Sequence, residues 1–172
     1  MITPEGERTF ATFLGAATAL KAARIPWEAF ESYKLLHVEG YLVIEPALLE
    51  PVLKLARDRG LEVSYDLASY NVVEANMDQT RYILENYVDI IFANEEEARV
   101  FTGKEPLGAI EELARLCKVA VVKSGKNGSL VYDRGEIRQV RALPAEVRDT
   151  TGAGDLYAAG FLYGYLSGAT PE

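Results

Sequence analysis

Short apolar runs alternate with amphipathic stretches from residue 35 to residue 123, and this alternation constrains the fold more than any other feature of the chain. The runs have the length of strands, and the stretches between them keep the helical spacing of apolar side chains. A strand, a helix and a second strand in succession form a parallel pair joined by a right-handed crossover. The sequence therefore predicts an α/β fold with a mostly parallel sheet flanked by helices.

The expected elements follow from this pattern. Strands are predicted at 35–39, 61–66, 88–94, 119–123, 130–132 and 137–140, the last two joined across a turn at 133–136. Helices are predicted at 46–59, 75–85, 95–101 and 107–117, with a helical turn or two at 26–33, a short strand at 8–14 and a loop at 67–73. Because ligands bind beyond the carboxyl ends of parallel strands, Gly40, Asp66, Asn94 and the pair Ser124 and Gly125 are expected to be neighbours.

A second feature is the segment 149–155, Asp-Thr-Thr-Gly-Ala-Gly-Asp, which precedes thirteen residues without a charged side chain. Apolar or aromatic side chains occupy nearly every face of residues 156–168, so a buried helix is predicted there, ending near Gly168 and Pro171. The first N–H groups of a helix have no partner within it and carry partial positive charge, and glycines let a ligand approach the backbone. The segment therefore predicts an anion-binding cradle.

Asp155 does not suit a cradle that only binds anions, because its carboxylate repels phosphate. It fits if it accepts a proton from a hydroxyl group that attacks a phosphoryl group. Two other phosphate-binding patterns are absent from the sequence: there is no G-x-x-x-x-G-K-[ST], and Tyr157 stands where G-x-G-x-x-G needs its third glycine. The alternative interpretation is a glycine-rich helix entry without chemistry.

The pattern Asp-Thr-x-Gly-Ala-Gly-Asp resembles the C-terminal signature of the PfkB (ribokinase-like) carbohydrate and nucleoside kinases. The resemblance implies a ribokinase-like fold and the phosphorylation of a sugar or nucleoside hydroxyl by ATP. It also implies that Asp155 is the general base. The anion hole would be formed by the amides of Gly152, Ala153, Gly154 and Asp155 itself.

Two further segments resemble motifs of this family. Asn94-Glu95-Glu96-Glu97 matches an Asn-x-x-Glu motif, whose glutamate, here Glu97, helps to place Mg²⁺ through water; an acidic first helical turn is the alternative. Residues 123–128 match a Thr-x-Gly-x-x-Gly turn that cups nucleotide phosphates, with Lys123 where threonine is common and an ordinary β-turn as the alternative. The implied nucleotide-binding residues are Asn94, Lys123, Ser124, Gly125, Lys126, Gly128, Asp149, Thr150 and Thr151. In many members the 149–155 loop also borders a monovalent cation such as K⁺.

The composition of the chain restricts the kinds of partner and site that it can have. The net charge of −8 and the pI near 4.8 argue against a nucleic-acid surface, which needs a basic stripe. The single cysteine, Cys117, fits a reducing cytosol, and no apolar run reaches the ~18 residues of a membrane span. The single histidine, His37, is expected to be a satisfied core residue and not a ligand, so no zinc site is predicted.

The resemblance covers residues 1–172, interpreted as a single α/β domain, but not the whole family fold. Residues 1–14 resemble the exit strand of a β lid, and the lid itself and the Gly-Gly substrate motif are not seen in the sequence. Bare strand edges and an apolar face then predict self-association as a homo-oligomer. A second hypothesis is a catalytically silent kinase fragment that serves as an assembly or nucleotide-binding module.

Overall fold

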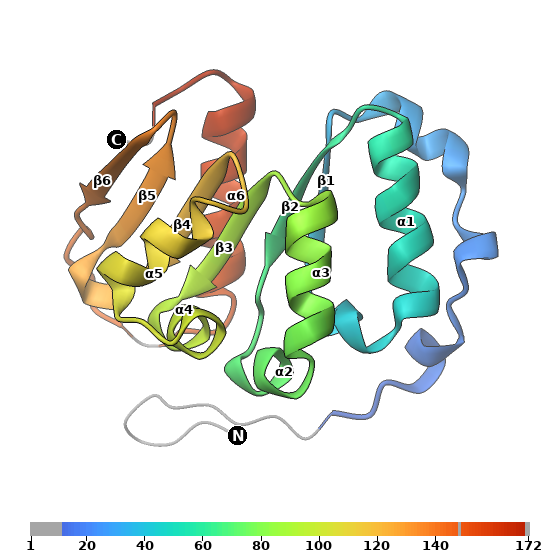
Figure 1. Cartoon of the computed structure of the whole chain (residues 1–172), viewed down its shortest axis with the longest axis horizontal. Helices are drawn as coiled ribbons and strands as arrows, with labels where there is room; N and C mark the ends of the chain where they lie inside the picture. The colour runs from blue at the N-terminus through green and yellow to red at the C-terminus, as the bar shows by residue number, and fades with distance from the viewer. Residues whose placement is uncertain (1–11, 148, 171–172) are drawn as a thin grey trace. The chain divides into compact units, whose positions relative to one another are not determined.

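The computed structural model of the protein describes residues 12–147 and 149–170 (Figure 1). The chain divides into two compact units, one of residues 20–142 and one that joins residues 1–19 to residues 143–172. The sheet and all the helices that connect its strands belong to the first of these units.

The unit of residues 20–142 contains a six-stranded sheet whose strands lie side by side in sequence order. The strands are β1 Leu35–Glu39, β2 Glu62–Asp66, β3 Ile90–Asn94, β4 Val119–Lys123, β5 Ser129–Asp133 and β6 Glu136–Val140. Strands β1 to β4 run parallel, and β5 and β6 return antiparallel beside β4. The predicted mostly parallel α/β sheet is confirmed.

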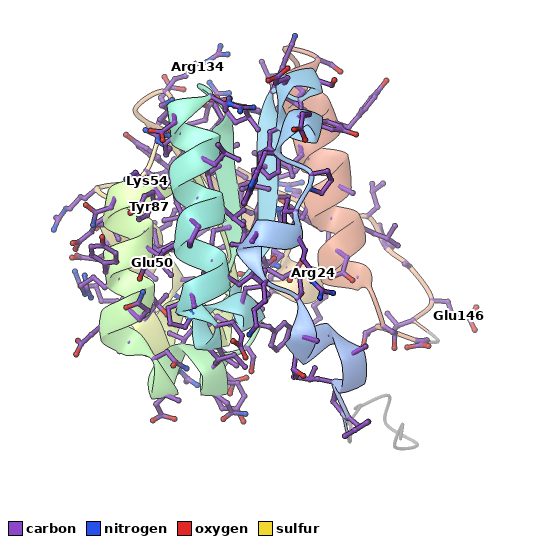
Figure 2. All side chains as sticks on the ribbon, turned by 90° about the vertical axis from the view of Figure 1, so that its right-hand side faces the viewer. Arg24, Glu50, Lys54, Tyr87, Arg134 and Glu146 are labelled. Carbon is purple, nitrogen blue, oxygen red and sulfur yellow. The ribbon has the colours of Figure 1, made fainter. Side chains whose placement is uncertain are left out.

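The predicted hairpin between β5 and β6 is also present. Its turn uses Arg134 and Gly135, which both have positive φ, 51° and 85°. Positive φ at both central residues is the geometry of a two-residue hairpin turn whose twist matches that of the strands. Arg134 points outward from the tip of this hairpin (Figure 2).

Helices connect the parallel strands and lie on one face of the sheet (Figure 1). They are α1 Pro46–Asp58, α2 Tyr70–Ala75, α3 Met77–Tyr87, α4 Glu95–Thr102 and α5 Pro106–Leu113, with 3-10 turns at Ala22–Arg24, Trp27–Ser32, Gly40–Ile44 and Gly125–Asn127. Right-handed crossovers between strands that advance in one direction place the connecting helices on one face. Alternate strand residues such as Val63, Tyr65, Ile91 and Ala93 therefore share one buried core with the helices.

Three expected elements differ from the structure. Helix α2 begins at Tyr70, so residues 70–73 are helical where a loop was predicted at 67–73. Val73 is buried and α2 packs against α4, and this packing outweighs the low helix propensity of asparagine and valine. Helix α5 ends at Leu113, since residues 114–116 form a turn that leads the chain toward β4. Residues 12–14 form no strand, and the rest of the strand predicted at 8–14 lies outside the described residues.

The other unit contains the 3-10 turn Gly15–Ala19 and helix α6, Ala153–Leu166. Helix α6 begins three residues before the predicted start at residue 156, so Gly154 and Asp155 lie within its first turn. The prediction that this helix is buried on all sides is wrong, because Leu156 and Tyr163 are exposed. A helix with this many apolar side chains is stabilised when another surface covers those that are exposed. Even so, none of the helices in the described residues has the length and apolar character to cross a bilayer.

Candidate active site

The carboxyl ends of β2, β3 and β4 bring polar side chains together at one edge of the sheet. Asn94 and Lys123 are partners in the β3–β4 register, and Asp66 pairs with Phe92 two positions before Asn94. A Cβ built on Gly40 would lie 2.6 Å from the carbonyl oxygen of Asp66, so the turn after β1 contacts the turn after β2 directly. The predicted neighbours therefore meet at the edge where α/β sheets bind ligands.

Asn94 and Glu97 form a capping box at the start of α4. The Asn94 side-chain oxygen accepts the N–H of Glu97 at 2.8 Å, and Glu97 Oε2 accepts the N–H of Asn94 at 2.8 Å. Asn94 Nδ2 also donates to Glu97 Oε1 at 2.7 Å. Both carboxylate oxygens of Glu97 are thus held in place, which is the arrangement that an Asn-x-x-Glu segment favours at a helix N-terminus.

Glu97 differs from its two acidic neighbours in being buried, with 4% of its surface exposed, whereas Glu95 and Glu96 are not buried in this way. Burial raises the pKa of Glu97 to about 7. The hydrogen bond from the Asn94 N–H and the Lys123 charge oppose this rise, and the Asp66 charge adds to it. A carboxyl group of this kind changes its charge readily when a cation or an anion comes near.

Lys123 and Asp66 form an ion pair across this edge. Lys123 Nζ lies 2.7 Å from Asp66 Oδ2, and the two side chains are 16% and 9% exposed. The other oxygen of Asp66 accepts the N–H of Ala68 at 2.9 Å. The Lys123 ammonium is therefore engaged within the protein. The resemblance at this position predicts a nucleotide contact but does not predict this ion pair.

A turn follows β4, and residues Gly125–Asn127 form a 3-10 turn within the segment that matches Thr-x-Gly-x-x-Gly. Ser124 N–H donates to the Gly128 carbonyl at 2.7 Å, and Gly125 has a φ of 51°. Lys126 is exposed on this turn. Gly128 has a φ of 89° and its Cα faces the backbone of Val140 without room for a Cβ. Gly128 therefore serves the contact with β6, whereas Gly125 and Lys126 remain open to a ligand.

The signature segment lies in the other unit, at the N-terminus of α6. Thr151 N–H donates to Asp149 Oδ1 at 2.8 Å, so the first aspartate holds the loop. Gly152, the N-cap, has a φ of 74°, a conformation that glycine adopts without strain. Ala153 N–H already donates to the Thr150 carbonyl at 3.1 Å, so an anion would compete for this amide.

Asp155 lies in the first turn of α6 and is exposed. A Cβ on Gly152 would lie 3.8 Å from Asp155 Oδ2, so the carboxylate folds back toward the start of the helix. A carboxylate, helix-terminal amides and a glycine with positive φ therefore occupy one turn. This arrangement permits proton abstraction next to a bound oxyanion.

The carboxylates at the sheet edge fit an indirect role toward Mg²⁺. In the part of the chain that the structure describes, no three His, Cys, Asp or Glu side chains form a metal-binding group. Mg²⁺ keeps several waters and often takes only one or two protein carboxylates besides substrate phosphates. Glu97, with both oxygens already fixed by Asn94, suits contact through water.

The family is identified once these features are set beside known proteins. A family model described as pfkB family carbohydrate kinase matches residues 1–172. The chain belongs to the pfkB family. This pfkB chain is 36% identical over 170 residues to a cytidine kinase of Thermococcus kodakarensis. The alignment covers 92% of this chain and 57% of the cytidine kinase.

Two solved structures share the fold of this pfkB chain. The adenosine kinase from Sinorhizobium meliloti matches with a TM-score of 0.90 at 36% identity, over 98% of this chain and 54% of that one. A probable sugar kinase from Rhizobium etli matches with a TM-score of 0.91 at 32% identity, over 98% of this chain and 53% of that one. The ribokinase-like fold is confirmed. The chain spans about half the length of these relatives.

Two features of the pfkB chain are not among those predicted from its sequence. Ala68 has a φ of 64°, and its carbonyl accepts the Tyr41 hydroxyl at 3.1 Å. The sequence signal for this strained turn is an aspartate at the end of a strand, since Asp66 caps the Ala68 amide. At the opposite edge, Asp89 is 4% exposed and pairs with Arg57 and Lys118. No pattern in the sequence indicates that pairing.

The prediction that His37 is a core residue is wrong, because the residue is exposed, but both of its ring nitrogens have partners. Its Nδ1 lies 2.7 Å from Ser64 Oγ and its Nε2 lies 3.2 Å from Glu39 Oε1. Its ring meets the Phe92 ring edge-on, with centroids 6.2 Å apart. The position therefore has a packing explanation.

Proposed function

We propose that this chain carries the phosphoryl-transfer machinery of an ATP-dependent kinase that acts on a hydroxyl group of a nucleoside or sugar. The observation that carries the proposal is the first turn of α6, where Asp155, the positive-φ Gly152 and the helix-terminal amides lie together. Membership of the pfkB family of carbohydrate kinases supports the reaction class. A nucleoside is the acceptor to test first, because two relatives at 36% identity are named cytidine kinase and adenosine kinase.

Asp155 is the proposed general base. It takes the proton of the acceptor hydroxyl while the hydroxyl oxygen bonds to the γ-phosphorus of ATP and the bond to the ADP oxygen breaks. The amides of Gly152, Ala153, Gly154 and Asp155 offset the charge on the transferring oxygens. Since Ala153 N–H donates to Thr150 in this structure, we expect the Gly154 and Asp155 amides to contribute most.

The remaining residues are proposed to bind the nucleotide and its metal. Asn94, Ser124, Gly125 and Lys126 lie at the carboxyl edge of β3 and β4, where family members hold phosphates. Asp149, Thr150 and Thr151 fix the loop that leads to α6, and K⁺ is the cation proposed beside it. Mg²⁺ would offset the phosphate charge, oriented by Glu97 through water.

The second candidate function is a silent kinase fragment that binds nucleotide or assembles with another copy. The exposed Leu156 and Tyr163 on α6 support self-association. Calorimetry with Mg-ATP, size-exclusion chromatography and a kinase assay together distinguish the two candidates.

The test of the first candidate is Asp155→Asn, assayed with Mg-ATP against cytidine, adenosine, ribose and fructose. Loss of the base should lower turnover by about 10²- to 10⁴-fold while nucleotide affinity stays unchanged. Asp78→Asn is the matched control, because Asp78 is also an exposed aspartate in the first turn of a helix, α3. Turnover of Asp155→Asn equal to that of Asp78→Asn would remove Asp155 from the mechanism. A wild-type chain that binds Mg-ATP without turnover would favour the second candidate.

A further inference from the structure

We infer that Lys123 is a positioning residue: its ion pair with Asp66 ties the turn after β4 to the strained turn after β2, so that both loops are held for a nucleotide that Lys123 does not itself contact. The inference rests on the proposed function for the identity of the ligand. The tie between the two loops stands on the geometry alone.

The ion pair joins two strands that are not neighbours. Asp66 ends β2 and Lys123 ends β4, and β3 lies between them in the sheet. The Lys123 side chain therefore crosses the end of β3 to place Nζ 2.7 Å from Asp66 Oδ2. Lys123 is also the last residue before the turn 124–128. A shift of either strand end thus moves the other.

The second oxygen of Asp66 holds a conformation that is unfavourable by itself. It accepts the N–H of Ala68, whose φ of 64° costs an alanine about 1 kcal/mol. The Tyr41 hydroxyl holds the same residue through its carbonyl, at 3.1 Å. Such a backbone persists only where its surroundings fix it, and the Asp66 carboxylate is the group that connects it to Lys123.

The turn after β2 is also linked to the capping box of Asn94 and Glu97. Residues 66–69 lead directly into α2, which packs against α4. The first turn of α4 carries the capping box. The loops after β3 and β4, which are proposed to bind nucleotide phosphates and Mg²⁺, are therefore connected through the turn after β2, by the Lys123–Asp66 ion pair on one side and by the packing of α2 on α4 on the other.

Burial argues against Lys123 as a direct phosphate ligand. Only 16% of its side chain and 9% of that of Asp66 is exposed. If the ammonium moved to a phosphate, the Asp66 carboxylate would stay buried without its cation, which is strongly unfavourable. Lys126, exposed on the following turn, is the lysine that is free to approach a phosphate.

The experiment compares Lys123→Met, Asp66→Asn and the double variant with the wild-type chain of residues 1–172. Lys118→Met is the matched control, because Lys118 also pairs with a buried aspartate, Asp89 at 3.0 Å, but at the amino edge of the sheet. Hydrogen exchange of the amides in residues 66–69 and 124–128 is measured without ligand. The Kd for Mg-ATP is measured by calorimetry.

Both single variants should speed exchange in both loops and weaken Mg-ATP binding by about tenfold, the size of a typical coupling between contacting residues. The double variant should lose no more affinity for Mg-ATP than the single variant that binds it more weakly, because all three variants lack the same Lys123–Asp66 ion pair. It also keeps the test available if Lys123→Met fails to fold, since it leaves no buried charge unpaired. Lys118→Met should leave both loops and the Kd unchanged.

Three results would overturn the inference. Exchange that rises in only one of the two loops would show that they are not tied. A Kd that weakens in Lys123→Met but not in Asp66→Asn would make Lys123 a direct ligand. If Lys123→Met and Asp66→Asn changed loop exchange and the Kd for Mg-ATP no more than Lys118→Met does, the ion pair would have only a structural role. A wild-type chain without affinity for Mg-ATP would instead remove the proposed function, while the exchange data would still decide the tie.

Discussion

Asn94 and Glu97 exchange hydrogen bonds across the first turn of α4, each side chain accepting the other residue's backbone N–H at 2.8 Å. This reciprocal pair fixes a buried carboxylate at the carboxyl edge of β3. The same two residues therefore determine where α4 begins and which acidic group faces the proposed nucleotide loops.

Asn94→Ala should destabilise the protein by about 1 kcal/mol, because the Glu97 amide loses its acceptor and Glu97 Oε1 loses its side-chain donor. The measurement is urea unfolding followed by circular dichroism. Ser69→Ala is the control: Ser69 is the N-cap of α2, but its side chain makes no capping hydrogen bond. A loss in Ser69→Ala equal to that in Asn94→Ala would contradict the assignment of the box as the stabilising feature.

The raised pKa of Glu97 predicts a stability that falls between acid and neutral pH. Burial raises the folded pKa of Glu97 to about 7 from its ordinary value of 4.5, so the folded chain holds this proton more tightly than the unfolded chain does. The contribution is fully present below pH 4.5 and is lost as the pH rises through 7. The shift corresponds to on the order of 3 kcal/mol.

Glu97→Gln should flatten this part of the stability profile, because glutamine keeps the capping geometry but does not titrate. The measurement is the free energy of unfolding at several pH values between 4 and 8, without metal or nucleotide. Glu96→Gln, one residue earlier in the same helical turn, should leave the slope unchanged. An unchanged slope in Glu97→Gln would show that another group titrates.

Much of the sheet and of the site could be predicted from local sequence, whereas the connections between distant residues could not. Strands β1 and β4 match their predicted bounds, since apolar runs of strand length between helical patterns have few other solutions. The Asn94 box was predictable because its partners lie three residues apart. The pairing of Lys123 with Asp66 spans 57 positions and depends on strand order, which no local pattern contains.

For Asp89 we predict the opposite pH dependence of stability, and at lower pH than for Glu97. Burial by itself raises the pKa of this carboxyl, but hydrogen bonds from the Val63 N–H, Lys118 and Arg57 outweigh it and lower the pKa below its usual range. The contribution to stability is present above the unfolded pKa of about 3.9 and is lost as the pH falls through the lower folded pKa. Acid unfolding should therefore involve Asp89.

Asp89→Asn should cost about 2 kcal/mol at neutral pH, because Arg57, Lys118 and the Val63 N–H lose a charged acceptor, while the two cations stay partly exposed to solvent. The control is Glu85→Gln, which breaks the exposed pair of Glu85 with Arg81 at 3.9 Å and should cost less than about 0.5 kcal/mol. Thermal unfolding at pH 7 and pH 3 gives both comparisons. A cost for Asp89→Asn that does not shrink at pH 3 would contradict the electrostatic explanation.

Gly40 is predicted to tolerate no side chain, for a reason different from that at most glycines of the chain. A Cβ there would lie 2.6 Å from the Asp66 carbonyl oxygen and 2.7 Å from that of Leu67, and both are backbone atoms that cannot rotate away. Gly40→Ala should therefore push the turn after β1 away from the Ala68 turn and cost about 3 kcal/mol.

Gly60→Ala is the comparison, because Gly60 has a φ of 72° and open space around it, so only backbone strain of about 1 kcal/mol is expected. Chemical denaturation measures both, and hydrogen exchange at residues 66–69 should rise only in Gly40→Ala. Equal losses without that change would show that the two turns do not depend on close contact at Gly40.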